Sequence, residues 1–247
     1  MRMIAGRRLL THQRQLVHTS LAVTAILVVR FQSTPIAFSV PRMQQPALIE
    51  PEQCEEVAFD CWERAHVDEN ISSDEFAKAR TVFGYGSLIF RPGFPYKRMY
   101  PACVRGYLRR FWQMSCDHRG TPESPGRVLA LLRTQDVSQI AGDGEDVVFG
   151  MAFEVDAADW QDVLETLDIR ERHGYTRTLT RLYPVSSDGH DELPSCGEAV
   201  IYYTYNPECS AAYAGPESVE ASAKVIARAV GPSGPNDEYL FSLVEAA

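Results

Sequence analysis

Cysteine pairs of the kind that bind metals or form redox centres are absent from this sequence. Its 247 residues include six cysteines, and none of them forms a Cys-x-x-C pair or a regular spacing. Zinc sites, redox pairs and disulfide frameworks leave such spacings, so reduced thiols are expected instead. The cysteines are Cys54, Cys61, Cys103, Cys116, Cys196 and Cys209.

Long apolar runs are absent as well. The longest covers nine positions, 21–29. A helix that crosses the hydrocarbon core of a bilayer needs about 18 apolar residues or more, because each residue adds only about 1.5 Å to its length. We therefore expect no membrane span.

Acidic residues are missing from the first 49 positions and dominate the charge of the rest. The first 49 residues hold six arginines and no Asp or Glu, while the whole chain has 24 basic and 33 acidic groups, a net −9. Residues 50–247 therefore carry 18 basic groups against the same 33 acids, or −15. So acidic a surface would repel a phosphate backbone, which argues against a nucleic-acid partner.

Composition divides the chain into three segments. Residues 1–49 are expected to be a targeting-like or disordered extension, because arginines share one side of a helical wheel there and Leu or Val the other. This pattern is typical of an organelle transit peptide. The alternatives are a secretory signal and a disordered extension without any targeting function. Residues 50–79 predict a partly helical linker, with a helix-capping tetrad at 72–75. The folded domain is expected over 80–247.

Apolar spacing predicts a domain of mixed strands and helices. The alternation over 147–155 predicts a strand with one face in the core. Asp156 is expected to cap the next helix, in which the apolar residues from Trp160 to Leu167 follow helical spacing. A bent strand is expected over 103–114, with a bulge at Gly106. Further strands are expected at 81–83, 128–132, 175–183 and 199–205, with one helix opening at Pro216 and a final helix through Leu243.

The segment Val82–Leu88 places two glycines around an aromatic residue. Gly84 and Gly86 lack Cβ atoms and permit φ > 0, so the backbone around Tyr85 can turn and aim several N–H groups at one point. Such donors suit a carboxylate or a polarised carbonyl, and a tight turn without a ligand is the alternative. A dinucleotide site is excluded, because Ile89 stands where its third glycine would be.

Glu171 stands where a predicted helix passes into a predicted strand. The helix is expected to stop at Gly174. A carboxylate in that place can serve a site at the mouth of the helix, or it can be a solvated group paired with a neighbouring arginine. Cys116 and His118 are a second candidate pair, for a cysteine hydrolase, although members of a catalytic triad normally come from distant parts of a sequence.

Four short motifs occur in order between residues 80 and 245. They are Val82–Leu88, Asp117–Glu123, Arg170–Glu171 ahead of Gly174–Tyr175, and Gly231–Gly234 with Asn236 and Glu238–Leu240. In order and spacing they resemble the ChaC family, the glutathione-specific γ-glutamylcyclotransferases.

This resemblance implies a fold and a reaction. The fold is α+β, a γ-glutamylcyclotransferase-like mixed β-barrel with flanking helices. In the reaction, the γ-glutamyl amine of reduced glutathione attacks its own γ-carbonyl, which gives 5-oxoproline and releases L-cysteinylglycine without a metal or cofactor. The resemblance names no protein partner. It implies a cytoplasmic protein, or a mitochondrial or other organellar one if residues 1–49 act as a transit peptide.

The resemblance also assigns the site. Glu171 is expected to be the catalytic base, and because an ordinary Glu with a pKa of about 4.3 is a weak base toward an ammonium, partial burial that raises its pKa is predicted. His173 stands where family members commonly have a glycine, which puts substrate preference in question. The alternative to an enzyme is a non-catalytic binding module that binds γ-glutamyl compounds or a protein partner through the same pocket. The backbone expected to bind the γ-glutamyl group is that of Val82, Phe83, Gly84, Tyr85, Gly86 and Ser87.

Overall fold

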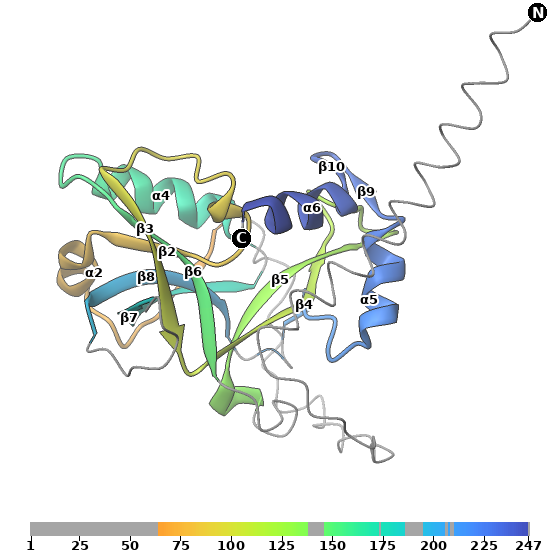
Figure 1. Ribbon diagram of the computed structural model, residues 1–247, viewed down its shortest axis with the longest axis horizontal. Coiled ribbons are helices and arrows are strands. Elements are labelled where there is room, and N and C mark those ends of the chain that lie inside the picture. Colours follow the sequence, from red (N-terminus) through yellow and green to blue (C-terminus); the bar gives the residue numbers. More distant parts are fainter. Residues whose placement is uncertain are drawn as a thin grey trace, which may run out of the picture.

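The computed structural model describes residues 64–137, 146–172, 174–185, 195–205, 207 and 210–246. The predictions for residues 1–49, for the first part of the linker and for His173 lie outside these ranges. Within them the chain has the predicted α+β fold, a closed mixed β-barrel with helices around it (Figure 1).

The barrel joins strands that are distant in the sequence. Its strand order is β7-β3-β6-β2-β8, and β8 pairs with β7 to close the ring. β2 runs parallel to β8 while the other neighbours are antiparallel, so the barrel is mixed. The strands are β2 (Thr81–Gly84), β3 (Arg98–Arg105), β6 (Val147–Glu154), β7 (Tyr175–Pro184) and β8 (Gly197–Thr204).

A second sheet leaves the barrel at Gly106. It consists of β4 (Tyr107–Ser115) and β5 (Gly126–Arg133), an antiparallel pair that projects from the barrel (Figure 1). Gly106 has φ 81°, which residues with a Cβ rarely adopt, and it lets the chain pass from β3 into a different sheet. The predicted single strand with a bulge at Gly106 is therefore wrong. Two strands meet there, and the irregularity in register comes later, between Arg110 and Gln113.

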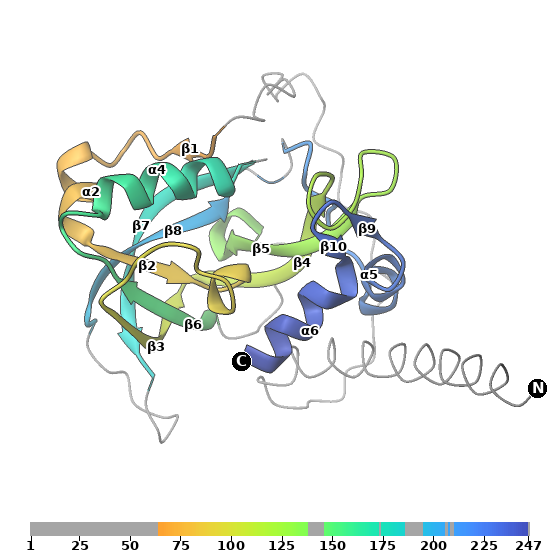
Figure 2. The same ribbon diagram turned by 90° about the horizontal axis from the view of Figure 1, so that it is seen from above.

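Helices cover the barrel on one side and the second sheet on the other. α2 (Ser73–Ala79) and α4 (Trp160–Arg170) lie against the barrel, and α5 (Val219–Ile226) and α6 (Asn236–Ala246) lie beside β4 and β5 (Figure 2). None of the helices in the described ranges is long and apolar enough to cross a membrane. The short elements are β1 (His66–Val67), η2 (Ser87–Ile89), η3 (Thr134–Val137), β9 (Val230–Gly231) and β10 (Gly234–Pro235).

The starts of two helices test the predicted caps. The Ser72 hydroxyl accepts from the N–H of Glu75 at 3.3 Å and the Glu75 carboxylate accepts from the N–H of Ser72 at 2.9 Å, which confirms the capping tetrad. Asp156 does not cap α4, because the helix begins only at Trp160 and the Asp156 carboxylate pairs with Lys97 at 2.9 Å. Apolar spacing located this helix correctly but could not show the extra turn in front of it.

Part of the predicted linker packs against the barrel. β1 pairs with β7, and Phe76 of α2 is only 3% exposed. The carbonyl of Phe76 accepts a 2.8 Å hydrogen bond from the indole of Trp160 in α4. Residues 64–79 therefore contribute to the core.

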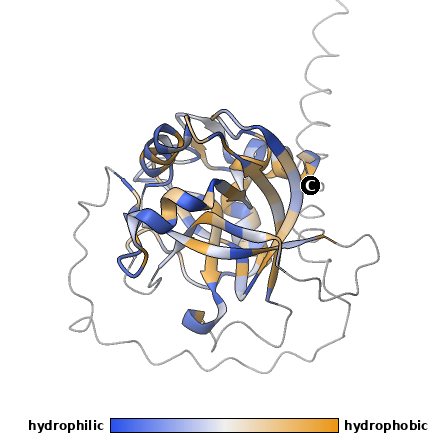
Figure 3. Ribbon diagram, turned by 90° about the vertical axis from the view of Figure 1, so that its left-hand side faces the viewer, coloured by the Kyte–Doolittle hydropathy of each residue, from blue (hydrophilic) through white to orange (hydrophobic). Residues whose placement is uncertain are grey.

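Both faces of strand β6 are covered, which corrects another prediction. Val148 and Ala152 belong to a core cluster shared with β5 and α6, whereas Phe153 and Val155 belong to one shared with α2 and α4. Phe149, on the face predicted to be buried, is 42% exposed. Hydrophobic ribbon segments gather on the central strands, and hydrophilic ones on outer helical turns and loops (Figure 3). A single core face was the wrong prediction because helices and a second sheet cover different faces of this strand.

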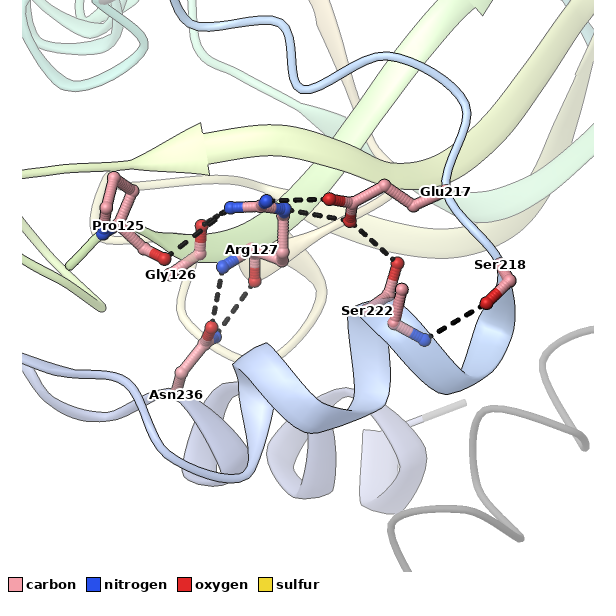
Figure 4. Close-up of polar contacts among 8 residues, drawn as sticks. Pro125, Gly126, Arg127, Glu217, Ser218, Ser222 and Asn236 are labelled. Atoms are coloured by element: carbon pink, nitrogen blue, oxygen red, sulfur yellow. Dashed lines mark hydrogen bonds and ion pairs between the residues drawn. The ribbon is translucent and has the colours of Figure 1, made fainter.

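Arg127 joins β5 to the two C-terminal helices (Figure 4). Its guanidinium donates two hydrogen bonds, of 2.9 and 2.7 Å, to the carboxylate of Glu217 just before α5. The side chain of Asn236, fully buried at the start of α6, accepts from the N–H of Arg127 at 2.6 Å and donates to its carbonyl at 2.9 Å. These contacts fix β5 relative to α5 and α6.

Replacing Asn236 by alanine is expected to lower the free energy of unfolding by about 2–4 kcal/mol, because two main-chain groups of Arg127 lose their buried partner. Urea unfolding followed by circular dichroism measures the loss. Glu245→Ala, an exposed change on the same helix, is the matched control and should leave the midpoint nearly unchanged. An Asn236→Ala protein as stable as that control would contradict the prediction.

Candidate active site

A cavity of about 420 Å³ lies where the barrel meets the second sheet. It is lined by the glycine turn after β2, the end of α4, the end of β4 with the loop that follows, the β9–β10 turn and α6. Its volume lies within the range of roughly 300–1,000 Å³ that is usual for small-molecule sites. Segments that are far apart in the sequence therefore converge on one pocket, and β5, β7 and β8 also contribute to its lining.

Four residues of the predicted binding segment line this cavity, and two do not. Val82 is fully buried and packs in the core cluster of α2 and α4. Gly84 lies against the side chains of Leu88 and Phe153. The two residues therefore shape the wall without facing the cavity. The four that face it are Phe83, Tyr85, Gly86 and Ser87.

The two glycines of the turn serve a close approach of chain segments. Neither Gly84 nor Gly86 has a positive φ, so the predicted use of left-handed backbone is wrong. A Cβ on Gly84 would lie 2.7 Å from the Cβ of Leu88, and one on Gly86 would lie 3.1 Å from the hydroxyl of Tyr239. Glycine is needed because η2 folds back onto β2 and α6 lies against the turn.

Tyr85 forms a fixed wall of the cavity. Its ring is 7% exposed, and its hydroxyl donates a 2.8 Å hydrogen bond to the carbonyl of Tyr202 in β8. The carbonyl of Tyr85 accepts a 3.2 Å hydrogen bond from Arg109 in β4. Both ends of the residue are thus held, one by the barrel and one by the second sheet.

Glu171 is a mostly buried carboxylate in the same cavity. It is the C-cap residue of α4, where its N–H donates to the carbonyl of Leu167 at 2.7 Å, and its side chain is 17% exposed. Burial raises the pKa of the Glu171 carboxyl above its ordinary value, and the nearby Arg170 guanidinium partly offsets that rise. Partial burial with a raised pKa is therefore confirmed, and a solvated surface carboxylate is excluded.

Arg170 connects Glu171 to the glycine turn. Its guanidinium donates to the carbonyl of Pro92 at 2.6 Å and to the hydroxyl of Ser87 at 3.0 Å, and its Nε lies 3.6 Å from the Glu171 carboxylate. One cation thus holds the end of α4 against the turn and lies beside the candidate base.

A cluster of polar side chains on the wall formed by the loop after β4 was not among the predicted site residues. The Arg172 guanidinium donates to the carboxylate of Asp117 at 3.1 Å, and Nε2 of His118 lies 3.5 Å from the same oxygen. Nδ1 of His118 lies 3.1 Å from the hydroxyl of Ser233. The available signal was the dense polar loop after β4, between two apolar strands, but a loop composition does not show which way its side chains face.

The cysteine-hydrolase alternative finds no support in the geometry. Cys116 is not among the residues that line the cavity. Burial and the neighbouring Asp117 carboxylate raise the pKa of the Cys116 thiol, whereas a nucleophilic cysteine needs a lowered one.

Within the ranges that the structure describes, no group of three His, Cys, Asp or Glu side chains is arranged to hold a metal ion.

Comparison with known proteins decides the family. The model of the ChaC-like protein family matches residues 80–247, more than half of the chain. The chain belongs to the ChaC-like family. Its fold agrees with a solved ChaC-like relative, a yeast γ-glutamyl cyclotransferase specific to glutathione, at a TM-score of 0.60 and 33% identity over 67% of this chain and 85% of that one.

Curated relatives of this ChaC-like chain carry consistent names. The glutathione-specific γ-glutamylcyclotransferase of Saccharomyces cerevisiae is 36% identical in an alignment that covers 67% of this chain and 84% of the relative. Glutathione-specific γ-glutamylcyclotransferase 1 of Homo sapiens is 37% identical over 70% of this chain and 72% of its own length. That of Danio rerio is 39% identical over 66% and 76%.

The motifs that carry the ChaC-like resemblance meet around the cavity. Besides the His118–Ser233 contact, Arg119 donates to the carbonyl of Pro235 at 2.8 Å, so the second and fourth motifs lie against each other. The first and third are joined by the hydrogen bond from Arg170 to Ser87. Contacts across 115 and 83 positions of the chain thus bring the four motifs to one site in this ChaC-like domain.

Proposed function

We propose that this chain is a glutathione-specific γ-glutamylcyclotransferase, which converts reduced glutathione to 5-oxoproline and L-cysteinylglycine. The observation that carries the proposal is a mostly buried carboxylate, Glu171, in the same cavity as the turn from Phe83 to Ser87. The names of the ChaC-like relatives at 36–39% identity support the choice of substrate.

The pocket acts first by positioning. The nucleophilic amine and the γ-carbonyl belong to one molecule, so the protein has to fold the γ-glutamyl group until the two atoms meet. Correct orientation of such an intramolecular attack can supply about 7–11 kcal/mol of the barrier. The turn with Tyr85 as a rigid wall provides a mould for that group, since both ends of Tyr85 are held by hydrogen bonds.

Glu171 acts by moving a proton. The amine of the substrate is mostly an ammonium near neutral pH, and it becomes a nucleophile when the Glu171 carboxylate takes one proton from it. Attack then forms the C–N bond of the five-membered ring, and the same carboxyl passes its proton to the departing amine of cysteinylglycine as the old amide bond breaks. The second proton, which the ring nitrogen loses after the attack, ends on that amine, so cysteinylglycine is released as an ammonium. Acid–base help of this kind is typically worth about 10²–10⁴ in rate.

Incubation of the purified protein with glutathione tests the proposal directly. Chromatographic detection of 5-oxoproline and cysteinylglycine in equal amounts is the expected result. γ-Glutamyl-alanine and oxidised glutathione, run in parallel, should react much more slowly. Binding of glutathione without any product would instead support a non-catalytic γ-glutamyl-binding module.

The pH dependence of kcat/KM should show the effect of burial on Glu171. A base works only when deprotonated, so activity falls as the pH drops through its pKa. Because burial raises that pKa, the acid limb should lie above the value of about 4.3 expected for an exposed Glu. Arg170→Gln removes the cation that lowers this pKa, so its acid limb should move to higher pH. A limb that stays in place or moves to lower pH would contradict this electrostatic coupling.

The cellular location that we propose is based on the resemblance to the family. We assign the protein to the cytoplasm, with an organelle as the alternative if residues 1–49 act as a transit peptide. Fractionation of cells that express the full chain or the chain from residue 50 onward distinguishes the two. Organellar recovery of the full chain alone would support the transit peptide and refute the cytoplasmic assignment.

A further inference from the structure

Arg170 and Arg172 flank Glu171 and are bound to two different walls of the cavity. Arg170 is held at the glycine turn, through Pro92 and Ser87. Arg172 is held at the loop after β4, through Asp117. The proposed function places the γ-glutamyl group at the glycine turn, and the rest of the tripeptide must then lie in the remainder of the cavity, which Arg172 also lines.

Arg172 keeps hydrogen-bonding capacity after its contact with Asp117. The guanidinium has five N–H donors, and one nitrogen, Nη2, reaches the Asp117 carboxylate at 3.1 Å. Its Nε is buried and has no hydrogen-bond partner among the described residues. That nitrogen is closed off from the cavity, but the side chain as a whole is 35% exposed and lines the cavity, so an acceptor on a ligand can reach its Nη nitrogens.

The charge of the cavity favours an anionic acceptor. Its lining holds four arginines and two carboxylates, although residues 50–247 as a whole carry a net −15. A locally cationic pocket on an acidic protein attracts negative groups selectively. The lining arginines are Arg91, Arg119, Arg170 and Arg172, and the carboxylates are Asp117 and Glu171.

We propose that Arg172, oriented by Asp117, binds the terminal carboxylate of the tripeptide and thereby selects substrates that carry a negative charge at that end. This inference rests on the proposed function. A planar guanidinium matches a carboxylate with two parallel N–H donors, and a neighbouring anion that fixes its plane reduces the ordering needed on binding. Arg172 is in these terms a specificity-determining residue, separate from the proton transfer at Glu171.

Glutathione and its glycine ethyl ester provide the test, because they share the γ-glutamyl bond and differ only in the terminal charge. The wild-type protein should prefer glutathione by about 10- to 100-fold in kcat/KM, which is the usual contribution of a charged hydrogen bond. In Arg172→Gln that preference should fall to nearly one, mainly through a higher KM for glutathione. Arg172→Lys should keep part of it, as a point charge without the planar fork.

Arg98→Gln is the matched control, since it removes the same charge from an exposed site outside the cavity and should keep the full preference. A merely structural effect of Arg172 would slow both substrates equally and leave their ratio unchanged. That result, or a wild-type protein without any preference, would overturn the inference.

Calorimetry in a Glu171→Gln background separates this inference from the proposed function. Binding of glutathione without turnover can be measured there, and Arg172→Gln should weaken it by a similar factor while binding of the ester changes little. Failure of the wild-type protein to make 5-oxoproline would refute the proposed function alone. Equal binding of glutathione with and without Arg172 would refute the carboxylate contact alone.

Discussion

Glu171→Gln is expected to remove nearly all formation of 5-oxoproline while the protein stays folded. The carboxamide has the shape of the carboxylate but cannot take a proton from the substrate amine, so a loss of about 10²–10⁴ in kcat is expected. Stability should not fall, because the change replaces a mostly buried carboxyl by a neutral group of equal size. Product formation is followed by chromatography, and folding by the thermal midpoint.

Glu165→Gln is the control for this experiment. Glu165 lies on the exposed side of the same helix, and its substitution should leave the rate unchanged. Retention of more than about a tenth of wild-type activity by Glu171→Gln would exclude the expected size of the acid–base effect. The proton would then have to leave by another route.

Gly120→Ala is expected to destabilise the protein severely. Gly120 is buried in the loop after β4, and a Cβ there would lie 2.1 Å from the nitrogen of Gly126 and 2.5 and 2.7 Å from the carbonyl oxygens of Ser115 and Ser124. Overpacked side chains usually cost about 1–3 kcal/mol because they can rotate away. Main-chain atoms cannot, so we expect a loss of about 3 kcal/mol or more in the free energy of unfolding, measured in urea.

Gly106→Ala separates packing from backbone conformation. Gly106 has φ 81°, but a Cβ there would meet nothing within 4 Å. Its substitution should cost only the left-handed conformation, about 1–2 kcal/mol. Equal losses for the two variants would mean that the loop around Gly120 relaxes readily, and the expected rigidity of that wall of the cavity would be wrong.

Local patterns predicted the elements better than their surroundings. The apolar spacing from Trp160 to Leu167 and the capping tetrad at Ser72 are confirmed, because both depend on residues within two helical turns. The bulge at Gly106 and the single core face of β6 were wrong, because each depends on which sheet or helix lies alongside. Hydrophobic periodicity indicates that one face of an element is covered, but it does not indicate which sheet or helix covers it.

The candidate site shows the same division. Sequence reasoning selected Glu171 and the glycine turn, and the structure brings them to one cavity, while their roles in binding and catalysis stay predictions. An arginine beside Glu171 was among the alternatives, but the long-range partners that hold the site together were not foreseen. Arg170 meets Ser87 across 83 positions and Arg172 meets Asp117 across 55, and no local spacing relates such residues.

The amino-acid order by itself determined the family, the α+β class and the place of one carboxylate at a helix end, since motif order and helical spacing are properties of the chain alone. Closure of the barrel decided the rest. It buried Glu171, which raised the pKa of that carboxyl, and it placed Arg170 and Arg172 at different walls of the pocket. Burial and distance between remote residues depend on how strands pair and helices pack, so only the tertiary structure could set them.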